Sequence, residues 1–291
     1  MRENGIYVDC TLGGGGHTSE ILRRLGGTGR VIAFDRDEEA VENAKKKFGQ
    51  RDDLTIIHDN FVNVRARLEE LGVNSISGAT VDLGVSSYQL DNAERGFSYM
   101  ADAPLDMRMD STQALSAYTV VNSYSEDELV RILYEYGQER YARRIAGRIC
   151  QCRSEAPILT TLQLSALIKE CVGRQANDSG HPAKRTFQAI RIEVNSELSV
   201  IEPTLRELTE MLEPGGRIAV ITFHSLEDRI VKQTFASLAQ GCTCPKDFPI
   251  CVCGKKPEIK LITKKPTLPS CSEVEDNSRS HSAKLRTAQK L

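Results

Sequence analysis

Four consecutive glycines at residues 13–16 come shortly after an apolar run at residues 6–8, which Asp9 follows directly. Glycines directly after a first strand allow a ligand to approach the backbone closely. A helix expected from Thr18 onwards would point its free N–H groups at that ligand. Asp35 lies nineteen residues after the last of these glycines, at the end of the second expected strand, where its carboxylate could accept both ribose hydroxyls of a nucleoside. The pattern predicts a nucleoside site, and the alternative is an ordinary tight turn with a solvated aspartate.

The spacing of the glycines helps to decide which nucleoside cofactor is bound. The dinucleotide fingerprint G-x-G-x-x-G needs a third glycine, where the helix packs closely on the strand. Counted from Gly13 or from Gly14, the third position is occupied by Thr18 or Ser19. The pattern therefore favours a smaller adenosyl ligand, and a nicotinamide-dependent oxidoreductase is the alternative enzyme.

Two further loops are expected beside this turn, because the carboxyl ends of parallel strands meet at one edge of a sheet. Asp59, Asn60 and Phe61 follow the third expected strand. Phe61 could stack on an adenine and Asp59 could accept from its amino group; the alternative is a core phenylalanine beside a helix-capping asparagine. After the fourth expected strand, Asp82 could face the cofactor, and the serines at residues 86–87 could face the second substrate.

The elements that must position these residues alternate regularly at the start of the chain. Short apolar runs are followed by segments with helical spacing, which indicates a parallel sheet with helices on both faces. From about residue 105 to 200 only helical patterns occur. We therefore predict an α/β fold, a doubly wound, mostly parallel sheet built from residues 1–104 and 201–291, with an inserted all-helical domain at 105–200. The expected strands cover residues 6–8, 30–34, 54–57, 78–83, 217–222 and 258–263.

Composition excludes several classes of protein. The chain has 291 residues, of which 38 are basic and 40 acidic, so a uniformly basic surface is excluded and any nucleic-acid contact must use local patches. No run of about 18 apolar residues occurs, and the first residues lack the apolar region of a signal peptide. We therefore expect a cytoplasmic protein with no membrane span.

Two local patches could contact the phosphates of a nucleic acid. Lys184, Gln188 and Arg191 share one face of an expected helix. Residues 254–291 hold nine Lys and Arg against four acidic residues, and residues 278–291 are expected to form a loose basic tail. Such charge suits phosphate contact, whose affinity falls with salt, and a solvated tail is the alternative.

Nine cysteines are an odd number and cannot all pair within the chain, which favours buried thiols or metal ligands in a reducing compartment. Cys242, Cys244, Cys251 and Cys253 could supply four thiolates to a zinc ion that braces a loop. Their C-x-C spacing is tighter than the usual spacing of roughly two to four intervening residues. The prediction therefore includes no metal, and the zinc site stays an open alternative.

With these motifs in view, the chain resembles the bacterial ribosomal RNA small subunit methyltransferase H family, also called the MraW family. Its members methylate the exocyclic N4 of a cytidine in the decoding region of 16S rRNA. The most specific matches are residues 104–110 (PLDMRMD) and 223–229 (FHSLEDR). The resemblance implies a Rossmann-like S-adenosylmethionine-dependent methyltransferase core with a helical insert. It spreads over nearly the whole chain, in residues 9–17, 33–37, 58–61, 81–91, 95–110, 186–198, 215–232 and 282–286.

The resemblance also implies partners and site residues. S-adenosylmethionine would be the cofactor, 16S rRNA within the small ribosomal subunit the partner, and the helical insert an RNA-recognition domain; a homodimer stays open. Relatives usually carry a longer segment before the first strand, which would here be either truncated or dispensable. They also usually have a second Arg where this chain has His281, which removes one expected phosphate contact. If the cofactor-binding positions of the family are transferred to the matching positions of this chain, the cofactor-binding residues would be Gly15, Gly16, His17, Asp35, Phe61, Asp82 and Gln89.

The acceptor in such a reaction is an aromatic exocyclic amine, whose lone pair is delocalised into the ring. Holding this amine in line with the S–CH3 bond would be the main task of the protein. No catalytic residue follows from the sequence. The candidates are Ser86, which could accept from the amine N–H, and His224, which could take the proton after transfer or have only a structural role. An RNA-binding factor without catalysis on the same scaffold is the remaining alternative function.

Overall fold

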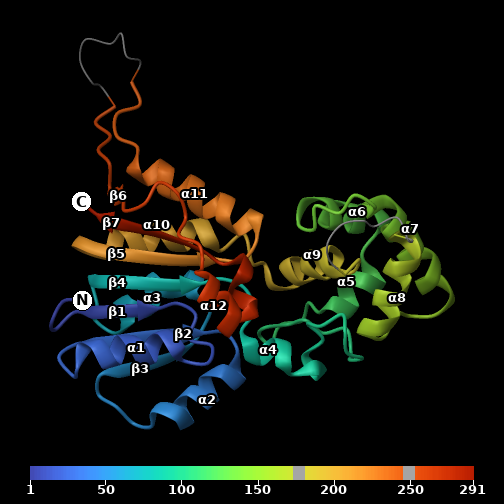
Figure 1. Cartoon of the computed structure of the whole chain (residues 1–291), viewed down its shortest axis with the longest axis horizontal. Coiled ribbons are helices and arrows are strands. Elements are labelled where there is room, and N and C mark those ends of the chain that lie inside the picture. The colour runs from blue at the N-terminus through green and yellow to red at the C-terminus, as the bar shows by residue number, and fades with distance from the viewer. Residues whose placement is uncertain (173–180, 245–252) are drawn as a thin grey trace. The chain divides into compact units, whose positions relative to one another are not determined.

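The chain forms two units, which we call the sheet unit and the helical unit. The sheet unit comprises Met1–Gly84 and Leu198–Leu291, and the helical unit comprises Val85–Glu197. Figure 1 shows the helical unit inserted in the chain between the fourth and fifth strands of the sheet unit. Its first residue precedes the expected residue 105, because the chain leaves the sheet soon after the fourth strand. The structure is a computed structural model that describes residues 1–172, 181–244 and 253–291.

Seven strands form one sheet in the order β3-β2-β1-β4-β5-β7-β6. Strands β1 to β5 are parallel, and β7 is antiparallel to both of its neighbours. The predicted doubly wound, mostly parallel sheet is therefore confirmed. Strand order reverses beside β1, which is the point where such sheets bind ligands at their carboxyl edge. The strands are β1 (Ile6–Asp9), β2 (Arg30–Asp35), β3 (Leu54–His58), β4 (Ile76–Asp82), β5 (Leu212–Thr222), β6 (Ile259–Leu261) and β7 (Lys284–Lys290).

Strand β2 explains why helices cover both faces of the sheet. Successive side chains of a strand point to opposite faces. Ile32 and Phe34 pack in one core cluster with helices α3, α10 and α11, whereas Val31 and Ala33 pack in two smaller clusters with α1 and α2. All four side chains are fully buried, as the unbroken apolar run predicts. The helices of the sheet unit are α1 (Gly16–Leu25), α2 (Glu38–Phe48), α3 (Val64–Glu70), α10 (Ile201–Met211), α11 (Ser225–Ala239) and α12 (Cys271–Asp276).

The basic C-terminal segment is not a loose tail, so that prediction was wrong. Its residues form a short 3-10 turn, η4 (Ser278–Ser282), and then β7, which lies between β5 and β6. The buried Arg286 of β7 donates to both carboxylate oxygens of Asp228 in α11, at 2.7 and 3.1 Å, and this pairing lowers the pKa of Asp228. A charge can be buried when it is paired and hydrogen-bonded. The many basic residues of this segment therefore led to the prediction of a tail where the chain forms a strand.

The helical unit has a core of its own, in which Leu129, Ile145 and Ile168 are fully buried. Ser125 forms a capping box with Glu128 at the start of α6. Within the described parts of the chain, no helix is both long enough and apolar enough to cross a membrane. The helices of this unit are α4 (Ser87–Asp91), α5 (Ala117–Ser123), α6 (Glu126–Glu135), α7 (Ala142–Glu155), α8 (Thr161–Val172) and α9 (Lys184–Asn195).

Candidate functional site

A buried acid, Asp9, fixes the glycine turn that follows β1. One of its carboxylate oxygens accepts from the hydroxyl of Thr18 at 2.7 Å, and the other accepts from the backbone N–H of Thr11 at 3.2 Å. Burial raises the pKa of Asp9. The carboxylate therefore ties the end of β1 to the first turn of α1. Sequence reasoning gave Asp9 no role, although an acid at the end of β1 with a hydroxyl residue nine positions later was a usable signal.

The glycines of the turn meet two different requirements. Gly15 has φ of +71°, and a Cβ on it would lie 2.7 Å from Cε2 of Phe48. A side chain at this position would therefore meet both backbone strain and a clash. By contrast, a Cβ on Gly14 or Gly16 would meet no other atom within 4 Å. The turn thus leaves open space over the backbone just where α1 begins, as a ligand that approaches the backbone requires.

The structure brings Asp35 to the glycine turn, as the sequence predicted. Its Oδ2 accepts from the backbone N–H of Gly13 at 2.7 Å, and its Oδ1 accepts from that of Asp37 at 2.9 Å. Burial raises the pKa of the Asp35 carboxyl. Each carboxylate oxygen has a further lone pair with which it could accept from a ligand hydroxyl. The acid and the turn thus form one site, and the contact of Asp35 with a ribose stays a prediction.

His17 and Asp82 face each other across the same edge of the sheet. Nε2 of His17 lies 3.4 Å from Oδ2 of Asp82, and the hydrogen bond to Asp82 raises the pKa of His17. The backbone N–H of Asp82 donates to the hydroxyl of Thr11 at 2.7 Å, which links the ends of β1 and β4. Oδ1 of Asp82 is buried and has no hydrogen-bond partner among the described residues. A buried acceptor without a partner is rare and indicates a place for a donor from a ligand or water.

Asp59 and Phe61 both have partners within the sheet unit. Asp59 accepts from Nε of Arg67 at 2.6 Å and from Nδ2 of Asn63 at 2.9 Å. Burial alone would raise the pKa of Asp59, but the hydrogen bonds from Arg67 and Asn63 together outweigh it, so the net pKa of Asp59 is lowered. Phe61 opens the short 3-10 turn η1 (Phe61–Asn63), which Asn60 caps, and it packs partly buried against the core of the sheet unit. Asn60 is thus the predicted capping residue, and the contacts of Asp59 and Phe61 with an adenine stay predictions.

His224 is the capping residue of α11. Its Nδ1 accepts from the backbone N–H of Glu227 at 3.4 Å, and its Nε2 lies 3.1 Å from Oε1 of Glu227. Glu227 is buried, and its Oε2 accepts from the backbone N–H groups of Phe223 and His224 at 2.8 and 3.1 Å. This arrangement favours the structural role of His224, because its Nδ1 accepts from the backbone N–H of Glu227; its buried Nε2 has no hydrogen-bond partner among the described residues. Glu227 had been missed, although the spacing of three residues from His224 is that of a capping box.

Ser86 and Gln89 form a capping box at the start of α4 in the helical unit. The Ser86 hydroxyl accepts from the backbone N–H of Gln89 at 3.2 Å, and the Gln89 side chain accepts from the backbone N–H of Ser86 at 3.0 Å. Gln89 is 4% exposed. Both side chains therefore stabilise a helix start, and their contacts with cofactor or acceptor stay predictions.

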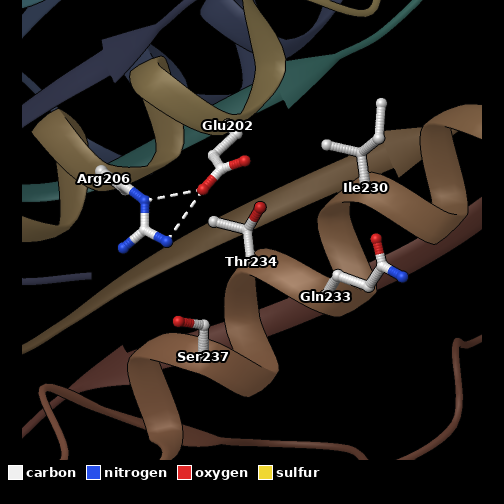
Figure 2. A pocket seen from close by; sticks show the side chains of 6 residues that line it. All are labelled: Glu202, Arg206, Ile230, Gln233, Thr234 and Ser237. Carbon is white, nitrogen blue, oxygen red and sulfur yellow. Dashed lines mark hydrogen bonds and ion pairs between the residues drawn. The ribbon is translucent and has the colours of Figure 1, made fainter.

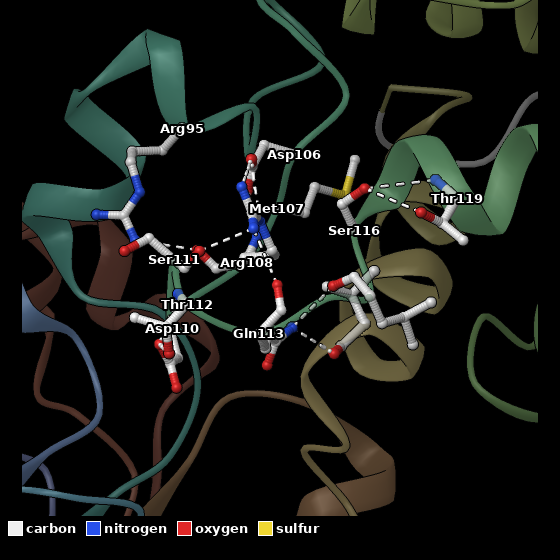
Figure 3. A network of polar contacts seen from close by, with 12 residues as sticks. Arg95, Asp106, Met107, Arg108, Asp110, Ser111, Thr112, Gln113, Ser116 and Thr119 are labelled. Atoms are coloured by element: carbon white, nitrogen blue, oxygen red, sulfur yellow. Dashed lines mark hydrogen bonds and ion pairs between the residues drawn. The ribbon is translucent and has the colours of Figure 1, made fainter.

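The segment at residues 95–113 of the helical unit, which contains the PLDMRMD motif, folds around Arg108. Nε of Arg108 donates to Oδ1 of Asp106 at 3.0 Å, and its Nη1 donates to the carbonyls of Ser111 and Gln113 at 2.8 and 2.9 Å. Figure 3 shows these side chains and carbonyls converging on the guanidinium. We call this arrangement the Arg108 network.

Asn195 of α9 completes the Arg108 network. It accepts from the backbone N–H of Met109 at 2.8 Å and donates to the carbonyl of Met107 at 2.7 Å. Met107 is fully buried and has φ of +57°, which is an uncommon value for a residue with a side chain. The motif thus encodes a strained backbone that Asn195 holds in place.

The expected phosphate-binding face on α9 is largely engaged within the helical unit. Nε2 of Gln188 donates to the carbonyl of Tyr136 at 3.0 Å. Arg191 forms two hydrogen bonds with the carboxylate of Glu197, at 2.8 and 2.9 Å. Lys184 is exposed. Gln188 and Arg191 therefore have structural partners that the helical spacing alone did not reveal.

A shallow pocket lies between α10 and α11 of the sheet unit. One wall carries an ion pair between Glu202 and Arg206, at 2.8 Å, and Figure 2 shows that the two side chains point toward each other. The lining residues include two hydroxyls, Thr234 and Ser237, but no histidine and no acid beyond this paired, exposed couple, so the glycine turn is the better candidate site. The lining residues are Glu202, Arg206, Ile230, Gln233, Thr234 and Ser237.

Comparison with known proteins agrees with the resemblance. The chain matches the MraW methylase family over residues 1–291. Relatives called ribosomal RNA small subunit methyltransferase H are 54% identical in Clostridium botulinum (strain Kyoto / Type A2) and 52% identical in Halothermothrix orenii; each match covers 100% of this chain and 94% of the relative. The solved structure of an rRNA methylase from Streptococcus thermophilus aligns with a TM-score of 0.42 at 12% identity, covering 100% of this chain and 89% of that chain.

Proposed function

The chain belongs to the MraW methylase family, and from this premise we propose that it transfers a methyl group from S-adenosylmethionine to the exocyclic N4 of one cytidine in the decoding region of 16S rRNA. One observation carries the proposal: the Asp35 carboxylate lies 2.7 Å from the backbone N of Gly13, so the acid and the glycine turn form a single site. The name that the relatives share supports the substrate class. The N4 position rests on the resemblance of residues 104–110 and 223–229.

The residues at the carboxyl edge of the sheet fit an adenosyl methyl donor. The space over Gly14 and Gly16 allows a ligand to lie against the backbone, where the first N–H groups of α1 are free of intrahelical partners. The buried Oδ1 of Asp82 needs a donor, and Asp35 has lone pairs for ribose hydroxyls. The carboxylates also suit a ligand with a positive sulfonium. When bound, the donor supplies an electrophilic methyl group.

The contribution of the protein to the reaction is positioning. An amine conjugated with a pyrimidine ring is a weak nucleophile, and holding such a group in line can contribute about 7–11 kcal/mol. Ser86 retains a lone pair beyond its capping bond and could accept from the amine N–H. His224 caps α11 through its Nδ1, and its role as acceptor of the proton after transfer stays a prediction.

The RNA partner would be bound by basic residues that the fold leaves exposed. We propose the helical unit as the RNA-recognition domain and the assembled small subunit in the cytoplasm as the target. Arg286 is paired with Asp228 and is not available for phosphate contact. Within the sheet unit, exposed lysines are better candidates than Arg286 and would supplement the contacts of the helical unit: Lys255, Lys256, Lys260, Lys264 and Lys265.

Transfer of labelled methyl groups onto small subunits from a strain that lacks the enzyme, followed by nucleoside mapping, tests the proposal. We expect label on cytidine N4 with the natural chain, loss of transfer with Asp35→Ala, and unchanged transfer with the control Asp52→Ala, since Asp52 is exposed. Label on C5 or on a ribose oxygen would contradict the N4 assignment. RNA binding without any transfer would instead favour a non-catalytic binding factor.

A further inference from the structure

Three cysteines converge in the connection between α11 and β6, outside the site described above. The Sγ atoms of Cys242, Cys244 and Cys253 all lie within 4.8 Å of one another. Sγ of Cys242 and Sγ of Cys253 are 3.6 Å apart, although the two residues are separated by ten positions in the chain. Cys251, the fourth cysteine of the motif, lies outside the described residues.

The sulfur separations suit a shared metal ion. Two thiolates on one tetrahedral zinc, each with a bond of about 2.3 Å, are about 3.8 Å apart. A disulfide requires about 2 Å between its sulfurs. The 3.6 Å between Cys242 and Cys253 therefore fits a metal-bridged pair and is far from a covalent bond.

Backbone N–H groups point at two of these sulfurs. The N–H of Thr243 donates to Sγ of Cys253, and the N–H of Cys244 donates to Sγ of Cys242, both at 3.4 Å. A thiol is a weak acceptor, whereas a thiolate ligand is commonly held by outer hydrogen bonds of this kind. Gly254 has φ of +61°, so the chain can turn directly after Cys253.

Packing does not explain this cluster. Cys242 and Cys253 are exposed, whereas Cys10 and Cys171 are buried, as free structural cysteines normally are. Lys255 and Lys256 lie two and three residues after Cys253, so positive charge is available close in the chain to the negative charge of several thiolates. The cluster thus has the donors, the spacing and the charge balance of a soft-metal site.

We propose that Cys242, Cys244 and Cys253 bind one Zn²⁺ ion as thiolates. Each thiol releases one proton on binding, and no electron is transferred. The ion fastens the end of α11 to the chain that enters β6, and thereby stabilises the β6 edge of the sheet. Its role is structural, and its occupancy can be measured separately from methyl transfer.

Metal content measured on the full-length protein tests this proposal. We expect one zinc per chain in protein purified without chelator, and a thiolate-to-metal charge-transfer absorption when Co²⁺ replaces zinc. Cys242→Ser and Cys253→Ser should each lower zinc occupancy at least tenfold. The control Cys271→Ser changes an exposed cysteine outside the cluster and should retain full occupancy. Circular dichroism of each variant shows whether the fold is retained.

Two results would overturn the proposal. One is folded protein that contains no zinc and takes up neither Zn²⁺ nor Co²⁺ after reduction. The other is a Cys242–Cys253 disulfide found by mass spectrometry in protein prepared under reducing conditions. Neither result depends on methyl transfer, so failure of the metal site and failure of the proposed function are distinguishable.

Discussion

The glycine turn of the sheet unit and the Arg108 network of the helical unit both contain residues with uncommon backbone dihedral angles. They differ in hydrogen bonding: a buried carboxylate oxygen at the turn lacks a partner among the described residues, whereas the polar groups of the network are paired. Gly15 and Met107 both have positive φ. At the turn, Oδ1 of Asp82 is buried without a partner among the described residues, and Gly16 faces open space. In the Arg108 network, donors and carbonyls bond to one another and Met107 is sealed from solvent.

This difference separates a binding site from a structural motif. A buried acceptor that no protein group satisfies needs a ligand or water. A closed network keeps its geometry without any ligand and rigidifies its surroundings. A distinctive sequence motif such as PLDMRMD therefore indicates, in the first place, a particular backbone conformation. It indicates contact with a ligand only where some of its hydrogen-bond donors or acceptors have no partner within the protein.

The largest effect is expected from Asn195→Leu, which removes both bonds of the side chain to the backbone of Met107 and Met109. Two buried backbone groups lose their partners, so the free energy of unfolding should fall by about 2–5 kcal/mol. Urea denaturation measures this, with the exposed Gln151→Ala as a control expected to change stability by less than about 0.5 kcal/mol. A stability equal to that of the control would show that the network is not structural.

Gly15→Ala should come next. The added methyl group meets both φ of +71° and the ring of Phe48, so we expect a loss of about 2–3 kcal/mol of stability in thermal unfolding. Gly14→Ala is the matched control, since its Cβ meets no atom within 4 Å. Equal stability of the two variants would contradict the requirement for glycine at position 15.

Gly16→Ala separates binding from stability. The methyl group occupies space left for the ligand and touches no protein atom, so the fold should keep its stability or gain slightly. The affinity for S-adenosylhomocysteine should fall about tenfold, roughly 1.4 kcal/mol, in calorimetric titration. The exposed Glu42→Ala should bind like the natural chain. Undiminished affinity of Gly16→Ala would place the ligand elsewhere.

The smallest effect concerns pH. Pairing with Asp82 raises the pKa of His17 from its ordinary value of 6.5, so the stabilisation is complete below that value and is lost as pH rises through the higher folded-state pKa. Because both side chains are about a third or more exposed, we expect only a few tenths of a kcal/mol. The stability difference between the natural chain and His17→Gln should shrink as pH rises above 6.5. A difference that is constant with pH would exclude this coupling.

Most of the sheet could be predicted because parallel strands buried on both faces appear as short apolar runs. Strand β7 could not, since Arg286 interrupts its apolar pattern and is neutralised by Asp228, a partner 58 residues away in the chain. The helical unit begins at Val85, earlier than the residue 105 expected from the sequence, because α4 after β4 has only five residues and gives little helical pattern to detect.

At the candidate site, the sequence indicated which residues lie at the carboxyl edge but not how their polar atoms are shared. Asp35 and the turn meet as expected. The partners of Asp59 and His224 were missed, since Arg67 and Glu227 serve ordinary helix positions in the sequence. Unused hydrogen-bonding capacity, such as that of the buried Oδ1 of Asp82, is a property of the folded arrangement and has no signature in residue spacing.

The pairing of β4 with β5 also sets an order of events during synthesis on the ribosome. The two strands are neighbours in the sheet, but the whole helical unit lies between them in the chain. Residues 85–197 have a core of their own and can condense while one edge of β4 still has bare N–H and carbonyl groups. Such an edge is prone to pair with foreign strands. A nascent-chain chaperone that shields strand edges would therefore be needed most after the insert has emerged and before β5 follows it.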